Sequence, residues 1–163
     1  MHLLSEVGRS MPKVYMLIGV PGCGKSTWAC NQEWYNDCSY ISTDTWIELE
    51  ARRQGKTYSD VFNEYIPKAT HIMNEHIKLA IHAEQDIIWD QTNMSSKSRA
   101  KKLAMLPNYE KIAVVFRTPE KEELDRRLAN RPGKIIGDHI IKSMIDSYNE
   151  PTIEEGFKEI WYV

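Results

Sequence analysis

The chemistry of this chain is indicated first by a stretch with the spacing of a phosphate-binding loop, Gly19-Val20-Pro21-Gly22-Cys23-Gly24-Lys25-Ser26. It fits Gly-x-x-x-x-Gly-Lys-Ser/Thr at every defined position. Its glycines let backbone amides approach phosphate oxygens, and the helix that follows adds partial positive charge at its N-terminus. Lys25 is expected to reach the β- and γ-phosphates and Ser26 to hold Mg²⁺. The predicted nucleotide-binding residues are Gly22, Cys23, Gly24, Lys25, Ser26 and Thr27.

Asp44 is the candidate general base. It follows a short strand candidate at residues 39–42, and Thr45 and Glu48 have the spacing of a capping box, so we expect a helix to begin at Thr45 with Asp44 just outside it. The carboxyl edge of a parallel sheet is where ligands bind. A carboxylate there can accept a hydroxyl proton and orient attack on the γ-phosphate. The alternative is a solvated aspartate in front of a helix.

Asp90 and Asn93 follow the apolar strand candidate at residues 86–90. Asp90 is expected to hold Mg²⁺, directly or through a water, or to pair with Lys25 near the acceptor. The alternative for Asp90 is a cap of the Thr92-Asn93 turn. Asn93 is expected to bind substrate or to orient a catalytic loop.

Arg127 and Arg131 lie four residues apart, beside Arg126, where a helix runs into Pro132-Gly133. The spacing predicts that both guanidinium groups share one helix face. A segment with two arginines can close over a triphosphate as a lid, with Arg131 binding the nucleotide and both arginines serving catalysis. The alternative is a solvated helix end stabilised by its cations.

The elements that must position these residues alternate between strands and helices. Such alternation predicts an α/β fold with three layers, α/β/α, around a central five-stranded parallel sheet. Pro67 is expected to divide the periodic segment 58–84 into two helices, and a further helix is expected at residues 138–148, followed by a short one at 151–156. A helix capped by Ser95 or Ser96 should carry a solvated basic face, which would touch an anionic polymer if the acceptor is one; its residues are Lys97, Arg99, Lys101 and Lys102.

Composition agrees with one globular domain. The 163 residues are 42% apolar and 27% charged, and the net charge of −2 argues against a strongly basic nucleic-acid coat. No apolar run has the length of a membrane span, and the N-terminus lacks a signal-peptide core, so we expect a cytoplasmic protein. Residues 1–12 are expected to be a leader, which is either disordered or precedes an internal start at Met11. Residues 13–163 are expected to form the kinase domain. The three cysteines have no C-x-x-C pair and are expected to be reduced.

Four motifs together carry a resemblance to a known family. They are Gly-Val-Pro-Gly-Cys-Gly-Lys-Ser-Thr-Trp-Ala, Ile-Ser-Thr-Asp, Ile-Ile-Trp-Asp-Gln-Thr-Asn-Met and Arg127-x-x-x-Arg131. The chain from Lys13 onward resembles the kinase domain of phage polynucleotide 5′-kinases, within the zeta-toxin and polynucleotide-kinase-like AAA group. The resemblance implies a P-loop kinase fold, ATP and Mg²⁺, Asp44 as the base, and Arg127 and Arg131 in the lid. For a phage-encoded protein, the cytoplasm would be that of the host.

The chain also departs from that family. The phage enzymes have an arginine three residues after the base, used on the 3′ phosphate of the acceptor, where this chain has Ile47. The phosphatase domain of the bifunctional members has no counterpart here. The Asp-Gln-Thr-Asn run with its basic helix is also similar to the kinase-like domain of heterogeneous nuclear ribonucleoprotein U, which binds nucleic acid.

Three functions therefore stay open. The first is ATP-dependent phosphorylation of a hydroxyl, foremost the 5′-hydroxyl at the single-stranded end of DNA or RNA. The second is a kinase for a nucleotide, nucleoside, modified base or small metabolite, which Ile47 and the acidic net charge favour. The third is a non-enzymatic, nucleotide-dependent nucleic-acid-binding module. The oligomeric state is left open by the sequence.

Overall fold

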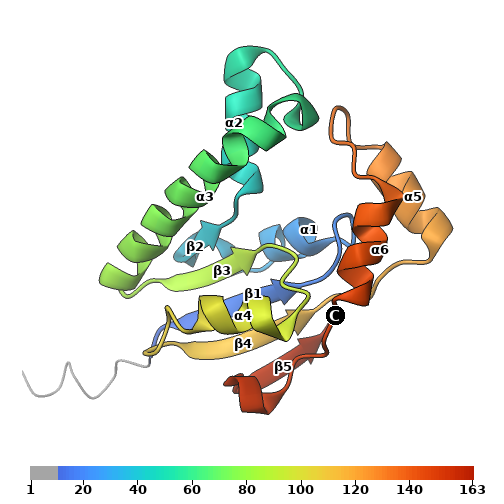
Figure 1. Cartoon of the computed structure of the whole chain (residues 1–163). Helices are drawn as coiled ribbons and strands as arrows, with labels where there is room; N and C mark the ends of the chain where they lie inside the picture. Colours follow the sequence, from blue (N-terminus) through green and yellow to red (C-terminus); the bar gives the residue numbers. More distant parts are fainter. Residues whose placement is uncertain (1–10) are drawn as a thin grey trace, which may run out of the picture.

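The computed structural model describes residues 11–163, so the predicted leader at residues 1–12 lies almost entirely outside the described residues. Five strands form one parallel sheet with helices on both faces (Figure 1), which confirms the predicted α/β architecture. The strands are β1 (Lys13–Ile18), β2 (Cys38–Ile41), β3 (Asp86–Asp90), β4 (Glu110–Val115) and β5 (Glu159–Tyr162). The α-helices are α1 (Lys25–Cys30), α2 (Asp44–Gln54), α3 (Tyr58–His82), α4 (Ser96–Leu103), α5 (Lys121–Ala129) and α6 (Asp138–Asp146). Short 3₁₀ helices span Tyr35–Asp37 and Ile153–Glu155.

Strand β1 is the centre of the sheet, whose order is β2-β3-β1-β4-β5. An unbroken apolar run suits this place because a central parallel strand is covered on both faces. The register pairs Leu17 with Asp90 of β3 and Ile18 with Val115 of β4. The carboxyl ends of β1 and β3 therefore meet at one edge, where ligands bind in open α/β sheets.

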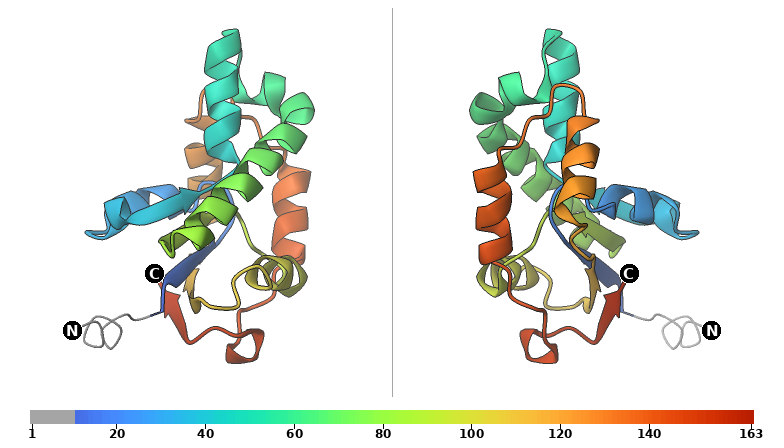
Figure 2. Two further views of the ribbon diagram at one scale, coloured as in Figure 1. Left: turned by 90° about the vertical axis from the view of Figure 1, so that its left-hand side faces the viewer. Right: turned by 90° about the vertical axis from the view of Figure 1, so that its right-hand side faces the viewer.

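The two faces of the sheet are covered differently. Tyr15 and Leu17 face the short helix α1 and a cluster of aromatic side chains, in which Tyr15 stacks on Trp34 with ring centres 4.1 Å apart. Met16 and Ile18 face the opposite way and share a core with residues of α4, α5 and α6. The side views in Figure 2 show α1 on one side of the sheet and α4 and α6 on the other.

Helices α2 and α3 form an arm that rises from the carboxyl edge of the sheet (Figure 1). The arm has its own apolar core, in which Ile47 is fully buried with Ala51, Val61 and Ala69. The prediction of two helices divided at Pro67 is wrong, because α3 runs unbroken over 25 residues with Pro67 inside it. Pro67 lies on the exposed side of α3, so the carbonyl that loses its partner can bind water, and packing on both sides of Pro67 holds the helix together.

Other expected boundaries shift by a few residues. Helix α2 begins at Asp44 rather than at Thr45, with Ser42 Oγ accepting the Thr45 backbone N–H at 3.2 Å, so Asp44 lies in the first turn and not outside the helix. Helix α6 ends at Asp146 rather than at Tyr148. Gly55 ends α2, and Ser95, one of the two predicted caps, caps α4.

Candidate active site

The loop between β1 and α1 has the backbone of a phosphate cradle. Gly22 and Gly24 have φ values of +83° and +99°, in the region that favours glycine. A Cβ on Gly22 would also lie 3.1 Å from Leu128 of α5, and one on Gly19 would lie 2.6 Å from Cys23 Sγ. The Gly19 backbone N–H donates to the Thr92 carbonyl oxygen at 3.0 Å, which ties this loop to the segment after β3.

Lys25 is buried inside this cradle. Its Nζ donates to the carbonyl oxygens of Gly19 at 2.8 Å and Val20 at 2.9 Å. Burial lowers the pKa of Lys25, although Cys23, Asp90 and Asp44 oppose the shift. Burial also raises the pKa of the Cys23 thiol, which keeps it protonated at neutral pH. The ammonium group of Lys25 is therefore poorly solvated, and such a group can form strong charge-assisted hydrogen bonds to phosphate oxygens.

Ser26, Asp90 and Tyr40 form a cluster at the end of the cradle. Ser26 Oγ donates to Asp90 Oδ2 at 2.7 Å, and the Tyr40 hydroxyl donates to the same carboxylate oxygen. Burial and the Asp90 carboxylate raise the pKa of Tyr40, so it stays a neutral donor. Asp90 was predicted to hold Mg²⁺ or to pair with Lys25; here it accepts from Ser26, while Lys25 Nζ donates to carbonyl oxygens. The contact of Tyr40 with Asp90 was not predicted.

The donor set of this cluster fits Mg²⁺. Mg²⁺ prefers oxygen ligands and is usually held by one or two protein groups together with substrate phosphates and waters. The Ser26 hydroxyl and the Asp90 carboxylate are such oxygens and lie next to each other. When bound, Mg²⁺ would neutralise charge on the phosphates; Ser26 would contact it, and Asp90 would orient Ser26 or a metal-bound water. Within residues 11–163, no three or more His, Cys, Asp and Glu side chains gather as a metal cluster.

Asp44 binds two side chains from other parts of the chain. The Tyr58 hydroxyl, from α3, donates to Asp44 Oδ1 at 2.6 Å, and Lys134 Nζ, from the α5–α6 loop (residues 130–137), donates to Oδ2 at 2.7 Å. Burial raises the pKa of Asp44, but Lys134, Tyr58 and Arg131 together outweigh it and hold the pKa below its ordinary value. Asp44 is therefore ionised at neutral pH, and half of its side chain is exposed.

Two cavities meet at these groups. The first, of about 600 Å³, lies between the phosphate loop, α3 and α6, and the second, of about 540 Å³, lies beside α1, β2 and α2. Both are lined by Ser26, Thr27, Asp44, Asp90, Arg131 and Lys134. A reacting hydroxyl and a γ-phosphate placed here would contact a base, cations and the cradle together.

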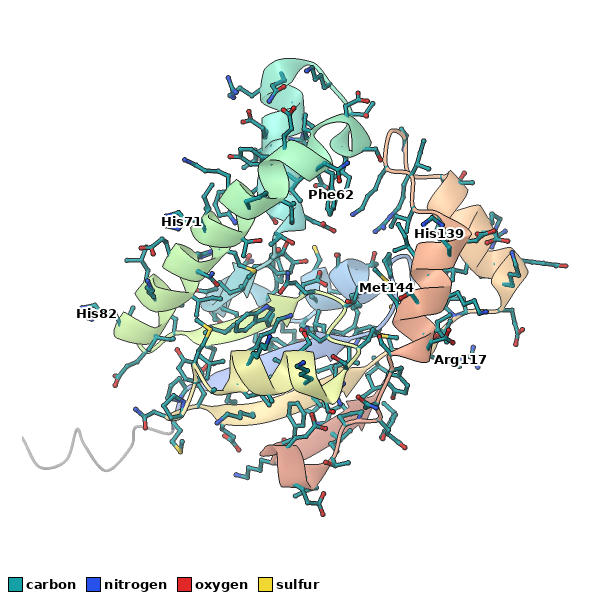
Figure 3. The ribbon with its side chains drawn as sticks, viewed as in Figure 1. Phe62, His71, His82, Arg117, His139 and Met144 are labelled. Atoms are coloured by element: carbon teal, nitrogen blue, oxygen red, sulfur yellow. The ribbon has the colours of Figure 1, made fainter. Side chains whose placement is uncertain are left out.

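The first cavity also has an apolar wall. It is formed by Phe62 and Ile66 of α3 and by Ile140 and Met144 of α6. Figure 3 shows Phe62 and Met144 on opposite sides of the opening between α3 and α6, whereas His71 and His82 lie along α3 away from it. The wall offers a flat, apolar part of a substrate a place to pack, next to Asp44.

The predicted arginine pair is separated in the structure. Helix α5 ends at Ala129, so Arg131 lies beyond it, and the prediction that both guanidinium groups share a helix face is wrong. Arg131 lines both cavities. Arg127 is outside both linings; it donates to Glu123 at 2.8 Å and to the Gly22 carbonyl oxygen at 3.2 Å. Arg126 pairs with Glu123 on the surface.

Asn93 and the basic face of α4 lie beneath the site instead of in it. Asn93 is 2% exposed, with a φ of 50°; its amide donates to the Leu17 carbonyl oxygen at 2.8 Å and accepts from Lys102 at 2.5 Å. Such contacts suit a residue that orients a loop. The Asn93 side chain lies outside both cavity linings. Arg99 is fully buried against Glu155, at 2.8 Å, so the prediction that it belongs to a solvated face is wrong.

Sequence reasoning missed Tyr40, Tyr58, Lys134 and the apolar wall. Lys134 follows Arg131-Pro132-Gly133 directly, so a cation after a glycine turn was the available signal. Tyr58 and Tyr40 occur in ordinary helix and strand patterns. The neighbouring sequence does not show whether such a tyrosine donates to a carboxylate or only packs in the core.

Comparisons with known proteins identify the family of the chain. Residues 14–151 match a family described as AAA domain, and the chain belongs to that family. The heterogeneous nuclear ribonucleoprotein U-like protein 2 of Mus musculus is 22% identical over 139 residues, which are 82% of this chain and 18% of that protein. The human protein of the same name is 20% identical over the same share. The chain thus spans less than a fifth of these curated relatives.

Solved structures share the fold at low identity. A proposed kinase from Chloroflexus aurantiacus has a TM-score of 0.69 at 14% identity, covering 96% of this chain and 86% of its own. A chain of the Pnkp1/Rnl/Hen1 RNA repair complex has a TM-score of 0.64 at 20% identity, covering 88% and 46%. A gluconokinase from Sinorhizobium meliloti has a TM-score of 0.55 at 15% identity, covering 95% and 83%. The fold is therefore that of P-loop kinases. None of the helices within residues 11–163 has the length and apolar character needed to cross a membrane.

Proposed function

We propose that this chain is an ATP-dependent kinase that transfers the γ-phosphate of ATP, with Mg²⁺, to the 5′-hydroxyl of a DNA or RNA end. The observation that carries the proposal is the place of Asp44, an ionised carboxylate at the junction of two cavities that the phosphate loop also lines. Phosphoryl transfer needs positioning and charge stabilisation more than covalent help from the protein. A phosphate cradle, a carboxylate and cations at one junction supply both.

Each group has a role in this reaction. Lys25 and the loop amides would bind the donor phosphates, and Ser26 with Asp90 would hold Mg²⁺. Asp44 would accept the proton of the attacking hydroxyl, and Arg131 would stabilise charge on the transferred phosphoryl group. The α5–α6 loop would act as the lid, since it carries Arg131 and Lys134 to the junction.

The acceptor is inferred from the apolar wall. This wall suits the face of a nucleobase. Its aromatic side chain, Phe62, can stack on any base, and its other side chains are apolar: Ile66, Ile140 and Met144. The solved RNA repair complex that shares this fold supports a nucleic-acid end as the acceptor.

A second candidate is a kinase of a nucleoside or small metabolite. The small number of cations in the first cavity favours it. Among the described residues that line this cavity, the lysines and arginines are Lys25, Arg131 and Lys134. Two of these would serve the donor, which leaves little positive charge for a polymer backbone. The gluconokinase that shares this fold supports this candidate.

The test is transfer of labelled γ-phosphate, with Mg²⁺, to single-stranded DNA and RNA carrying 5′-hydroxyl ends, and to a panel of nucleosides, sugars and sugar acids. Asp44→Asn is expected to lose about 10²–10⁴-fold in transfer while it keeps ATP affinity. Label on a small molecule alone would favour the second candidate. Nucleic-acid binding without transfer to any acceptor would favour a non-enzymatic binding module.

A further inference from the structure

The charge environment of Asp44 depends on a residue ninety positions away in the chain. Lys134 Nζ lies 2.7 Å from Asp44 Oδ2 and 4.3 Å from the centre of the Tyr58 ring. Its side chain is only 10% exposed. A nearly buried ammonium group needs a charged partner, because an unpaired buried charge costs several kcal/mol, on the order of the desolvation penalty of an ion. Asp44 is that partner.

The backbone on both sides of Lys134 is fixed to the start of α3. The Ser59 backbone N–H donates to the Gly133 carbonyl oxygen at 2.9 Å, and the Ile135 N–H donates to Ser59 Oγ at 2.8 Å. Gly133 has a φ of +71°, and a Cβ there would lie 2.6 Å from the Thr57 side chain. In this structure, Lys134 therefore reaches Asp44 from a loop that is docked on α3.

Asp44 can keep both partners and still bind an acceptor. A carboxylate offers about four lone-pair sites, and Lys134 and Tyr58 use one each, so half of this half-exposed carboxylate remains available to a hydroxyl. The cationic and hydroxyl groups that face Asp44 are Lys134 and Arg131 of the loop, Tyr58 of α3 and Lys25 of α1. The carboxylates of Asp90 and Glu48 line the second cavity together with Asp44. Lys134 alone among these groups forms an ion pair with Asp44 in the described structure.

We propose that Lys134 is a positioning residue for this reaction: it orients the Asp44 carboxylate, keeps it ionised, and makes both depend on docking of the α5–α6 loop. The proposal rests on the proposed function in taking Asp44 as the general base. A base that is oriented only under a docked lid would act only when the cavity is closed, which limits transfer of phosphate to water.

The first test measures Asp44 directly and needs no turnover. The carboxyl carbon of Asp44 is followed by NMR over a pH titration of the full chain, with Asp44→Asn to assign the signal. In the wild type the pKa of Asp44 is expected below its ordinary value, and in Lys134→Met it is expected to rise by about 1–3 units, the range for an adjacent opposite charge. Lys134→Arg should stay near the wild type. Equal values in the wild type and Lys134→Met would overturn the proposal.

A second variant tests the dependence on docking. Ser59→Ala removes the acceptor of the Ile135 N–H and keeps Lys134, so the pKa of Asp44 should rise by less than in Lys134→Met. Lys142→Met, an exposed lysine on α6, is the matched control and should leave it unchanged. An unchanged Asp44 in Ser59→Ala would overturn the coupling to docking, and this variant also serves if Lys134→Met does not fold.

The third readout is the pH profile of kcat/KM. Because Asp44 works as a base above its own pKa, the acidic limb should move to higher pH in Lys134→Met. A loss that is equal at every pH would mean that Lys134 only supports the fold, and would overturn its positioning role. If the wild type transfers phosphate to no acceptor, the proposed function fails, while the NMR titration still decides whether Lys134 controls Asp44.

Discussion

The proposed donor side and the proposed acceptor side of the junction are built in different ways. The phosphate cradle is one continuous stretch, Gly19 to Thr27, at the end of the central strand β1. The acceptor side is assembled from α2, α3, the α5–α6 loop and α6. Backbone amides and a helix N-terminus can bind any phosphate, so a local motif suffices for the donor. Selecting an acceptor needs side chains from several directions, so that side depends on the fold.

The largest expected effect breaks the donor side. Lys25→Met removes the cation that is buried in the cradle and should reduce phosphoryl transfer by about 10³-fold. Because its Nζ also binds the carbonyl oxygens of Gly19 and Val20, ATP affinity should fall as well. Transfer rates and calorimetric ATP binding measure both effects. Asp44→Asn is the matched contrast, since it should keep ATP affinity; equal losses of affinity would contradict the division into two sides.

The next effect concerns the core of the α2–α3 arm. Ile47 is fully buried, so Ile47→Ala should lower the free energy of unfolding by about 2–5 kcal/mol. Urea unfolding measures the change. Leu49→Ala, on the same helix with a half-exposed side chain, is the control and should cost much less. An Ile47→Ala protein as stable as the wild type would mean that the arm is loosely packed.

A smaller effect is expected at the apolar wall. Phe62→Ala should raise KM for the acceptor by about 10-fold, the value of one base stacked on an aromatic ring, with KM for ATP unchanged. Steady-state kinetics with both substrates measures it. Leu79→Ala lies on the same helix, is 69% exposed and is outside both cavity linings, so it should change neither constant. A change in KM for ATP alone would move the acceptor out of this cavity.

The smallest effect separates the two arginines. Arg127 is partly exposed, pairs with Glu123 and donates to the Gly22 carbonyl oxygen, so Arg127→Ala should lower kcat by less than about threefold, as for an exposed charge pair. Arg131→Ala should lower it far more, because Arg131 lines both cavities. Single-turnover rates of the two variants make the comparison. Equal losses would restore the interpretation of two equivalent lid arginines.

Ile47 shows how far a resemblance to a family extends. The phage enzymes that the sequence resembles have an arginine at this position, but here the Ile47 side chain is enclosed between α2 and α3 and cannot reach an acceptor. An arginine introduced there would put an unpaired charge in an apolar core. The cation that pairs with Asp44 is Lys134, on a different element.

Much of the site could be predicted because its parts follow local rules. A glycine loop after an apolar strand, and carboxylates at the ends of strands that alternate with helices, place Lys25, Ser26, Asp44 and Asp90 at one edge of a parallel sheet. The unbroken α3 could not be predicted, because a proline in an isolated segment favours a break, and only packing against α2 and the sheet overrides it. Arg99 was placed in solvent for the same reason, since its partner Glu155 is 56 residues away.

The sequence by itself determined the phosphate cradle, the parallel sheet and the alternation of strands and helices along the chain, because glycine conformations and hydrophobic periods act over a few residues. Only the tertiary structure decided what surrounds Asp44. Tyr58 and Lys134 lie 14 and 90 positions from it, and their donation to one carboxylate depends on how α3 and the α5–α6 loop dock. Electrostatic interactions act through space over a few ångströms, so the state of a charged group is fixed by the fold and not by its neighbours in the chain.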